Sequence, residues 1–175
     1  TVVEESNIGY GTVQFYRKSS GALYAVIRNT FNTYEREITN SYVDILGVEQ
    51  GASNLSIIYT KGNSVEIVEM NIVSNIVQIV SRNEITSNGG GAITNVEYVK
   101  DSNNVLHFVY LDSMGQSSLY EKPDLMYYNT LNEVNEVLHY GFRDHLGGSD
   151  YVNSYVNEVV PVMTIDNNDN IVVMY

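Results

Sequence analysis

The feature of this sequence that most constrains its fold is a strand-turn-strand pattern that recurs along the chain. Residues 93–129 hold its clearest copy, which reads as strand, tight polar turn, strand, long polar loop and strand. The second strands of the four copies are GALYAVI from Gly21, NLSIIY from Asn54, NVLHFVY from Asn104 and NIVVMY from Asn170. Such continuous apolar segments are typical of strands covered on both faces. We therefore expect an all-β fold of antiparallel meander repeats.

The repeats divide the chain into four units. We place them at residues 11–40, 41–92, 93–153 and 154–175, with residues 1–10 completing the last unit. Together they form a single all-β domain, or a fragment of one, over residues 1–175. One stretch also allows a helix, because apolar residues fall there at helical spacing: Leu131, Val134, Val137 and Leu138. We favour a strand over residues 133–142.

Composition and charge exclude several classes of function. The formal net charge is −12 and the nine basic residues are scattered, whereas a nucleic-acid partner requires clustered Lys and Arg. We expect no nucleic-acid partner. The chain has no cysteine, which excludes disulfides, thiolate metal sites and cysteine nucleophiles. No apolar run reaches the roughly 18–20 residues of a membrane helix, so we expect no membrane insertion.

The ends and the composition of the chain indicate its context. The sequence starts at Thr1 and stops at Tyr175 within an apolar strand. We expect it to associate with further chains or with the rest of a larger protein. Its acidic charge and its many Tyr and Asn residues favour an extracellular location, or the surface of a cell or virion.

Three stretches share a strand, an Asp/Asn/Gly turn and a strand that ends in an aromatic residue: residues 99–110 with 124–128, residues 162–175 and residues 46–59. In this the chain resembles the β-propeller families, in particular those with sialidase-like or BNR-type repeats. The resemblance implies four-stranded blades, either about four of them or part of a larger propeller. The chain lacks an Asp-box and any Trp, so no catalytic residue is carried over from sialidases. The alternative architecture is a β-sandwich.

The expected functional face is the end of the sheets that carries the long loops. Alternate connections of a meander fall at the same end, and binding residues usually lie on loops held by a rigid scaffold. The long connections are residues 28–33, 82–92, 111–124 and 141–153. The candidate binding residues on or beside them are Arg82, Asp112, Tyr120, Arg143, Asp144, His145, Asp150 and Tyr151.

The densest of these loops spans residues 141–154. It brings a cation, two carboxylates, an imidazole and a phenol together. Asp144 and His145 are suited to act as acid and base or to bind a metal, with Arg143 holding an anionic group. The competing interpretation is a solvated charge pair next to a glycine turn.

A candidate calcium site lies near the end of the chain. Apart from this site, we expect the protein to need no cofactor. Asp166, Asn168 and Asn170 alternate like the first oxygen ligands of a calcium loop. Asp and Asn also favour tight turns, and residues 101–104 occupy the same place in another copy, which favours a turn. His107 stands within an apolar strand and is interpreted as a core or interface histidine.

Two functions fit these patterns. The first is a non-enzymatic extracellular or surface module of β-propeller type, which recognises a glycan or a protein through its long-loop face. The alternative is a propeller-type glycan-active enzyme, a glycoside hydrolase or lyase. The absence of catalytic motifs favours the first. Convergence of Arg82, Asp112, Arg143 and His145 in one pocket would favour the second.

Overall fold

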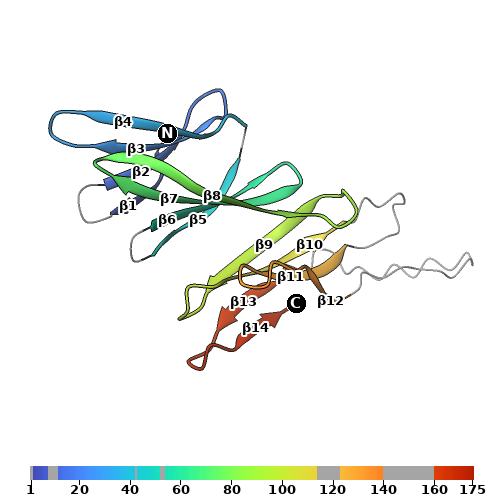
Figure 1. Cartoon of the computed structure of the whole chain (residues 1–175). Coiled ribbons are helices and arrows are strands. Elements are labelled where there is room, and N and C mark those ends of the chain that lie inside the picture. Colours follow the sequence, from blue (N-terminus) through green and yellow to red (C-terminus); the bar gives the residue numbers. More distant parts are fainter. Residues whose placement is uncertain (1, 8–11, 42, 52–53, 114–122, 140–159) are drawn as a thin grey trace, which may run out of the picture. The chain divides into compact units, whose positions relative to one another are not determined.

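The computed structural model describes residues 2–7, 12–41, 43–51, 54–113, 123–139 and 160–175 (Figure 1). Within them the regular structure consists of fourteen strands, and each recorded strand pairing is antiparallel. The prediction of an all-β, antiparallel fold is confirmed.

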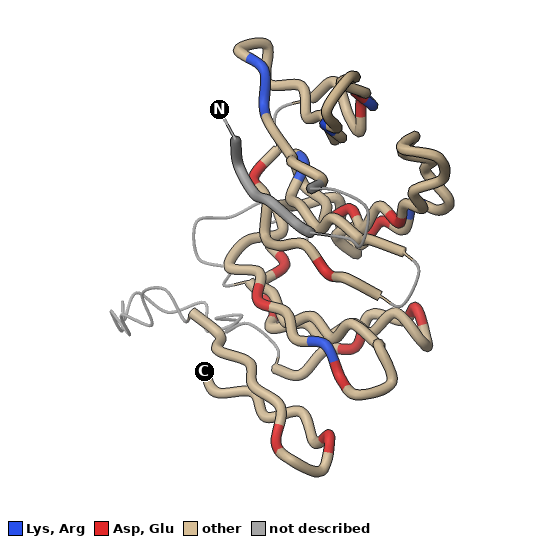
Figure 2. Tube along the Cα trace, turned by 90° about the vertical axis from the view of Figure 1, so that its left-hand side faces the viewer, with Lys and Arg blue, Asp and Glu red and all other residues tan. Residues whose placement is uncertain are grey.

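The described residues contain no helix of the length and apolarity that crossing a membrane requires. Acidic residues are spread over the chain in Figure 2. The chain divides into two compact units, Thr1–Ile85 and Thr86–Tyr175.

The first unit begins with a four-stranded sheet in the order β1-β2-β3-β4. Its strands are β1 (Val2–Asn7), β2 (Thr12–Arg17), β3 (Leu23–Arg28) and β4 (Thr33–Thr39). The sequence assigns residues 1–10 to the last unit, but in the structure β1 pairs with β2, with Asn7 opposite Thr12. Strands that follow each other closely in the chain usually pair with each other, so β1 belongs to the first sheet.

The second sheet of this unit has the order β5-β6-β7-β8. Its strands are β5 (Asp44–Gln50), β6 (Asn54–Lys61), β7 (Ser64–Val73) and β8 (Ile76–Thr86). The sequence predicts a loop from Arg82 onward, whereas β8 continues to Thr86. Exposed Arg82 and Glu84 alternate with partly buried Asn83 and buried Ile85, so this polar segment keeps the period of two of a strand. The prediction that Arg82 lies in a loop is wrong.

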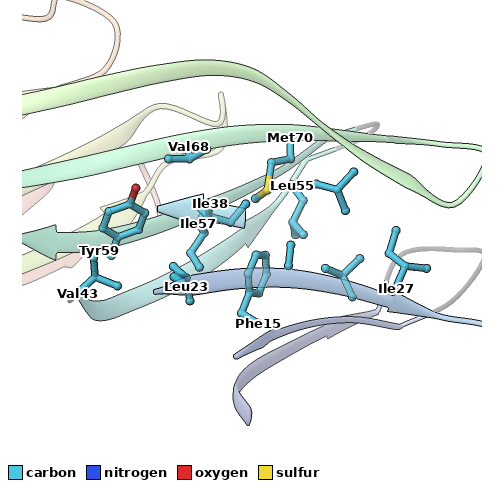
Figure 3. Close-up of a cluster of buried hydrophobic side chains, with 13 residues drawn as sticks. Phe15, Leu23, Ile27, Ile38, Val43, Leu55, Ile57, Tyr59, Val68 and Met70 are labelled. Atoms are coloured by element: carbon cyan, nitrogen blue, oxygen red, sulfur yellow. The ribbon is translucent and has the colours of Figure 1, made fainter. Parts of the chain in front are cut away.

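The core of the first unit lies between these two sheets (Figure 3). Thirteen buried residues form one cluster. Phe15, Leu23 and Ile27 enter it from the first sheet, and Leu55 and Met70 from the second. The residues from the first sheet are alternate residues of β2 and β3, because successive residues of a strand point to opposite faces.

The second unit contains a four-stranded sheet in the order β12-β11-β10-β9 and a hairpin of β13 and β14. Its strands are β9 (Ile93–Lys100), β10 (Leu106–Asp112), β11 (Asp124–Asn129), β12 (Glu136–His139), β13 (Val162–Ile165) and β14 (Ile171–Met174). The preference for a strand over a helix after residue 132 is confirmed by β12. Met163 packs with Val109, Leu111 and Leu125, so the hairpin shares a core with the sheet.

Three hairpins share one turn and one register. Residues 18–22, 101–105 and 166–170 join β2–β3, β9–β10 and β13–β14. In each turn the first N–H donates to the fifth carbonyl at 2.9–3.0 Å, and the fourth N–H to the first carbonyl at 2.9–3.1 Å. The fourth residue has a positive φ, and it is Gly21, Asn104 or Asp169. The register continues equivalently, with Arg17 opposite Leu23, Lys100 opposite Leu106 and Ile165 opposite Ile171.

Three of the four copies of the sequence repeat therefore form the same hairpin. One of the three, β2–β3, occupies a different place in its sheet. Strand β3 is the third strand of its sheet, whereas β10 is the second. The fourth copy, β5–β6, has a different connection, in which Gln50 pairs with Leu55 and the Gly51 N–H donates to the Asn54 carbonyl at 2.9 Å.

Candidate functional site

Arg82 belongs to a hydrogen-bonded cluster on the second sheet. Its guanidinium lies 3.4 Å from both Glu66 Oε2 and the Tyr59 hydroxyl, and it donates to the Ile38 carbonyl at 2.5 Å. The Tyr59 hydroxyl donates to Glu66 Oε2 at 2.6 Å, and Lys61 Nζ lies 2.8 Å from Glu66 Oε1. Arg82 thus bridges the end of β4 to β7 and supports the scaffold.

Electrostatics keep the buried Glu66 ionised. Burial disfavours its charged form, but hydrogen bonds from Lys61 and Tyr59 outweigh burial and lower the pKa of the carboxyl. Burial and then the bond to Glu66 raise the pKa of the Tyr59 hydroxyl, so Tyr59 stays a donor. A neutral donor and two cations around one carboxylate form a satisfied network, as buried charges require.

Asp112 anchors the connection that follows β8. Its side chain is buried, and it accepts hydrogen bonds from the Ser87 hydroxyl and from the Asn88 N–H, the latter at 2.9 Å. It pairs with Asp124, which is also a buried carboxylate. Asp112 is the last residue of β10 and Asp124 the first residue of β11. The sequence predicts that Asp112 lies in the connection of residues 111–124, whereas in the structure it belongs to β10 and is 0% exposed. The prediction that Asp112 lies in a loop is wrong.

The candidate calcium residues form a turn. Asp166 Oδ1 accepts the N–H groups of Asn168 and Asn170 at 2.8 and 2.9 Å, and Oδ2 accepts from Asn170 Nδ2 at 2.8 Å. The Asn170 side chain and the two backbone bonds lower the pKa of Asp166. Asp101 holds the equivalent turn with the same two backbone bonds. Within the described residues no three His, Cys, Asp or Glu side chains gather as metal ligands.

His107 lies in a chain of polar contacts between Asp101 and Tyr127. Its Nδ1 is 2.7 Å from the Tyr127 hydroxyl, and its Nε2 is 3.4 Å from Asp101 Oδ2. Both ring nitrogens therefore have partners. The interpretation of His107 as a satisfied histidine is confirmed.

Six predicted site residues lie outside the described residues: Tyr120, Arg143, Asp144, His145, Asp150 and Tyr151. Arg82 and Asp112 belong to different units. The convergence of Arg82, Asp112, Arg143 and His145 therefore stays an untested prediction.

The sequence predictions missed a pair of equivalent loops. The first loop, Asn29-Thr30-Phe31-Asn32, follows β3. The second, Asn129-Thr130-Leu131-Asn132, begins at the last residue of β11. Asn29 Oδ1 accepts the N–H groups of Phe31 and Asn32 at 3.0 and 2.8 Å. Asn129 Oδ1 accepts those of Leu131 and Asn132 at 3.1 and 2.9 Å. The Asn-Thr-x-Asn pattern, repeated one hundred residues apart, is the signal that reveals them.

Both loops expose apolar side chains at the same two positions. Phe31 is 90% exposed and Leu131 is 74% exposed. Three residues further along, Tyr34 and Val134 are exposed as well. The asparagine side chain fixes the backbone in both loops, while the apolar side chains contribute little to either core.

A second, partly exposed aromatic surface lies on the face of the first sheet opposite Phe15. The rings of Tyr16 and Tyr24 stack with their centroids 5.6 Å apart, and Lys18 Nζ lies 3.8 Å from the Tyr24 ring centroid. Lys18 Nζ is 3.5 Å from Glu35, and the Tyr24 hydroxyl donates to Glu37. Aromatic rings bordered by such polar groups are suited to binding sugars.

Comparisons of the chain with protein-family models, with curated proteins and with solved structures found no match.

Proposed function

We propose that this chain is a non-enzymatic extracellular or surface binding module, in which the apolar tip of the β3–β4 loop and that of the β11–β12 loop each bind a protein segment independently. The observation that carries the proposal is the duplicated Asn-Thr-x-Asn loop, with Phe31 and Leu131 exposed at the same position. A turn alone does not require a large apolar side chain there, because the asparagine and the backbone make its hydrogen bonds.

The energetics of these tips favour a binding role. Full burial of a Phe or Leu side chain is worth about 1.5–3 kcal/mol, a gain that the exposed residues leave for a partner. The loop backbone is already ordered by two hydrogen bonds to Asn29 or Asn129, so binding costs little further backbone entropy. Aromatic side chains such as that of Phe31 are enriched at protein interfaces.

The test is a selection of ligands from a displayed peptide library on the native chain. We expect each selected peptide to bind one of the two variants, Phe31→Ser or Leu131→Ser, at least about tenfold more weakly, because the buried apolar side chain is lost. Val73→Ser is the matched control, because Val73 is an exposed apolar residue outside both loops, and it should bind normally. Ligands that bind all variants equally would contradict the proposal.

A second candidate function is glycan binding by the Tyr16–Tyr24 surface, which the stacked rings and their acidic neighbours support. Screening on a glycan array tests it. Tyr24→Ala should abolish the signals, whereas Tyr24→Phe keeps the ring and should retain part of them. Signals that survive Tyr24→Ala would contradict this candidate.

We further propose that the four-stranded sheets are arranged as in a propeller, with a β-sandwich as the alternative. Their meander order β5-β6-β7-β8 and β12-β11-β10-β9 supports the first arrangement. Small-angle X-ray scattering of the intact chain distinguishes a ring of blades from two stacked layers.

A further inference from the structure

The connection between β8 and β9 contains the single Asn-Gly pair of the sequence, Asn88-Gly89 (Figure 1). Asparagine is most reactive before glycine, because glycine has no side chain to hinder attack of its own nitrogen on the asparagine amide. Both residues are exposed, so water reaches them. The pair therefore has the composition and the solvent access of a deamidation site.

Long hydrogen bonds hold the two reacting groups. The Gly89 N–H donates to the Ser87 hydroxyl at 3.3 Å, and the Gly90 N–H donates to the Ser87 carbonyl at 3.4 Å. Asn135 Nδ2 donates to Asn88 Oδ1 at 3.3 Å. These distances exceed the usual range of about 2.7–3.2 Å. Local opening that frees the Gly89 nitrogen and the Asn88 side chain therefore costs little free energy.

The flanks of the pair are held more firmly. The Asn88 N–H donates to the buried Asp112 carboxylate at 2.9 Å, and the Gly91 N–H donates to the Ser87 hydroxyl at 3.0 Å. The Ser87 hydroxyl in turn donates to Asp112. The bonds to Asp112 thus fix the start of the loop, while the peptide between Asn88 and Gly89 is held weakly.

We propose that Asn88 is a site of spontaneous modification, which converts to aspartate and isoaspartate at a rate limited by opening of the Ser87 turn. The Gly89 nitrogen attacks Asn88 Cγ and loses its proton. A bond between the two atoms forms, the Cγ–Nδ2 bond breaks, and ammonia leaves with the proton. Water then opens the resulting five-membered imide. Attack at Cγ gives aspartate, and attack at the backbone carbonyl carbon gives isoaspartate.

Asn63 provides an internal comparison within the same molecule. It is exposed in the β6–β7 turn, but its successor Ser64 is buried and pairs with Lys61 in the strand ladder. The Ser64 side chain hinders attack, and strand pairing holds its backbone in place. Exposure alone therefore does not make an asparagine of this chain reactive.

The modification changes the anchor of the β8–β9 connection. Either product places a carboxylate beside the buried Asp112, and isoaspartate also lengthens the backbone by one carbon between Ser87 and Gly89. The Asn88 N–H then no longer meets Asp112 in the same geometry, and Asp112 loses a donor. We expect the aged chain to unfold at a lower temperature than the fresh chain.

The test is incubation of the native chain in neutral buffer, followed by peptide mass spectrometry. We expect replacement of the Asn88 amide by a hydroxyl over time, with no change at Asn63. Labelling by an isoaspartyl methyltransferase should identify isoaspartate at the same position. A product that is entirely ordinary aspartate would overturn the proposal, because opening of the imide gives both forms.

Two variants probe the route. Gly89→Ala should lower the rate constant at least about tenfold, because its Cβ hinders the attack. Gly89 lacks the positive φ of Gly90, so alanine fits its backbone. Ser87→Ala removes the acceptor of the Gly89 N–H and should raise the rate constant at least about fivefold, because the turn opens more often.

An unstructured peptide of residues 84–92 supplies the reference rate. The proposal fails if this peptide converts fully while Asn88 of the native chain stays intact. It also fails if Gly89→Ala converts at the native rate, since the glycine nitrogen would then not be the attacking group, or if Ser87→Ala leaves the rate unchanged. The native time course tests the site even where a variant does not fold. Asn88 lies in neither apolar loop, so these outcomes are independent of the binding proposal.

Discussion

At the scale of single residues, this protein buries carboxylates inside hydrogen-bond networks. Glu66 is 7% exposed and is held by Tyr59, Lys61 and Arg82. Asp112 is 0% exposed and holds Ser87 and Asn88. A buried charge is tolerated only where its partners replace water, so these residues are expected to be sensitive to substitution.

The first prediction concerns Glu66→Gln. The pKa of Glu66 is lowered in the folded state. The ionised carboxylate therefore stabilises the fold at pH values above the usual pKa of a Glu. This contribution is lost as the pH falls through the folded pKa. We expect the variant to lose about 1–3 kcal/mol of unfolding free energy at pH 7, as for a broken buried network, and the difference to shrink at acidic pH. Urea denaturation across the pH range measures it, with the exposed Glu84→Gln as control. Parallel pH profiles for native and variant would contradict the argument.

The second prediction concerns Asp112. Asp112→Ala leaves the Ser87 hydroxyl and the Asn88 N–H without their acceptor, which costs about 1–3 kcal/mol. Asp112→Asn keeps an acceptor oxygen for these donors, so its loss should be smaller. Thermal unfolding of the two variants measures this order. The reverse order would contradict this argument, because both variants remove the charge and only Asp112→Asn keeps an acceptor.

At the scale of elements, the shared five-residue turn sets the register of three hairpins. Its fourth residue needs a positive φ, which Gly, Asn and Asp tolerate better than other residues. Asp101 and Asp166 stabilise two of the turns with side-chain bonds, whereas Lys18 occupies that position in the first. The first turn therefore depends most on its glycine.

The third prediction compares two substitutions of Gly21, which has a φ of 92°. Gly21→Ala should destabilise the first unit by about 1–2 kcal/mol, the cost of a left-handed alanine. Gly21→Asn should cost less, because Asn104 occupies the same place in the β9–β10 turn with a φ of 65°. Chemical denaturation measures both, with Ser20→Ala as control. Equal losses for alanine and asparagine would show that the conformation of this residue does not limit stability.

At the scale of the whole molecule, the two units have cores of different size. The thirteen buried residues between the first two sheets all come from the first unit. Among the described residues, nineteen buried hydrophobic side chains lie in the first unit and ten in the second. Because burial of apolar surface is the main stabilising term, the first unit should be the more stable.

The fourth prediction is that a fragment of residues 1–86 folds independently. It contains the complete cluster of thirteen and both sheets around it, so it should show the circular dichroism of a β protein and a cooperative thermal transition. A fragment of residues 87–175 should unfold at a lower temperature. A first fragment without a cooperative transition would mean that its core requires the second unit.

Local patterns predicted much of this fold. Alternation and apolar runs located the strands, and Asp, Asn and Gly located the turns at residues 101–104 and 166–169. Strand β8 was cut short in the prediction, because the polar sequence from Arg82 to Thr86 resembles a loop until Ile85 is seen to be buried. The exposure of Phe31 and Leu131 was not predicted, because the sequence alone does not show which apolar residues stay exposed.

By itself, the sequence determined which segments form strands and which residues turn the chain, because both depend on the backbone preferences of neighbouring residues. The tertiary structure decided that Arg82 supports a scaffold, that Glu66 and Asp112 are buried, and that β1 pairs with β2. Burial and pairing depend on which distant segments meet, and one strand's sequence does not specify its neighbours.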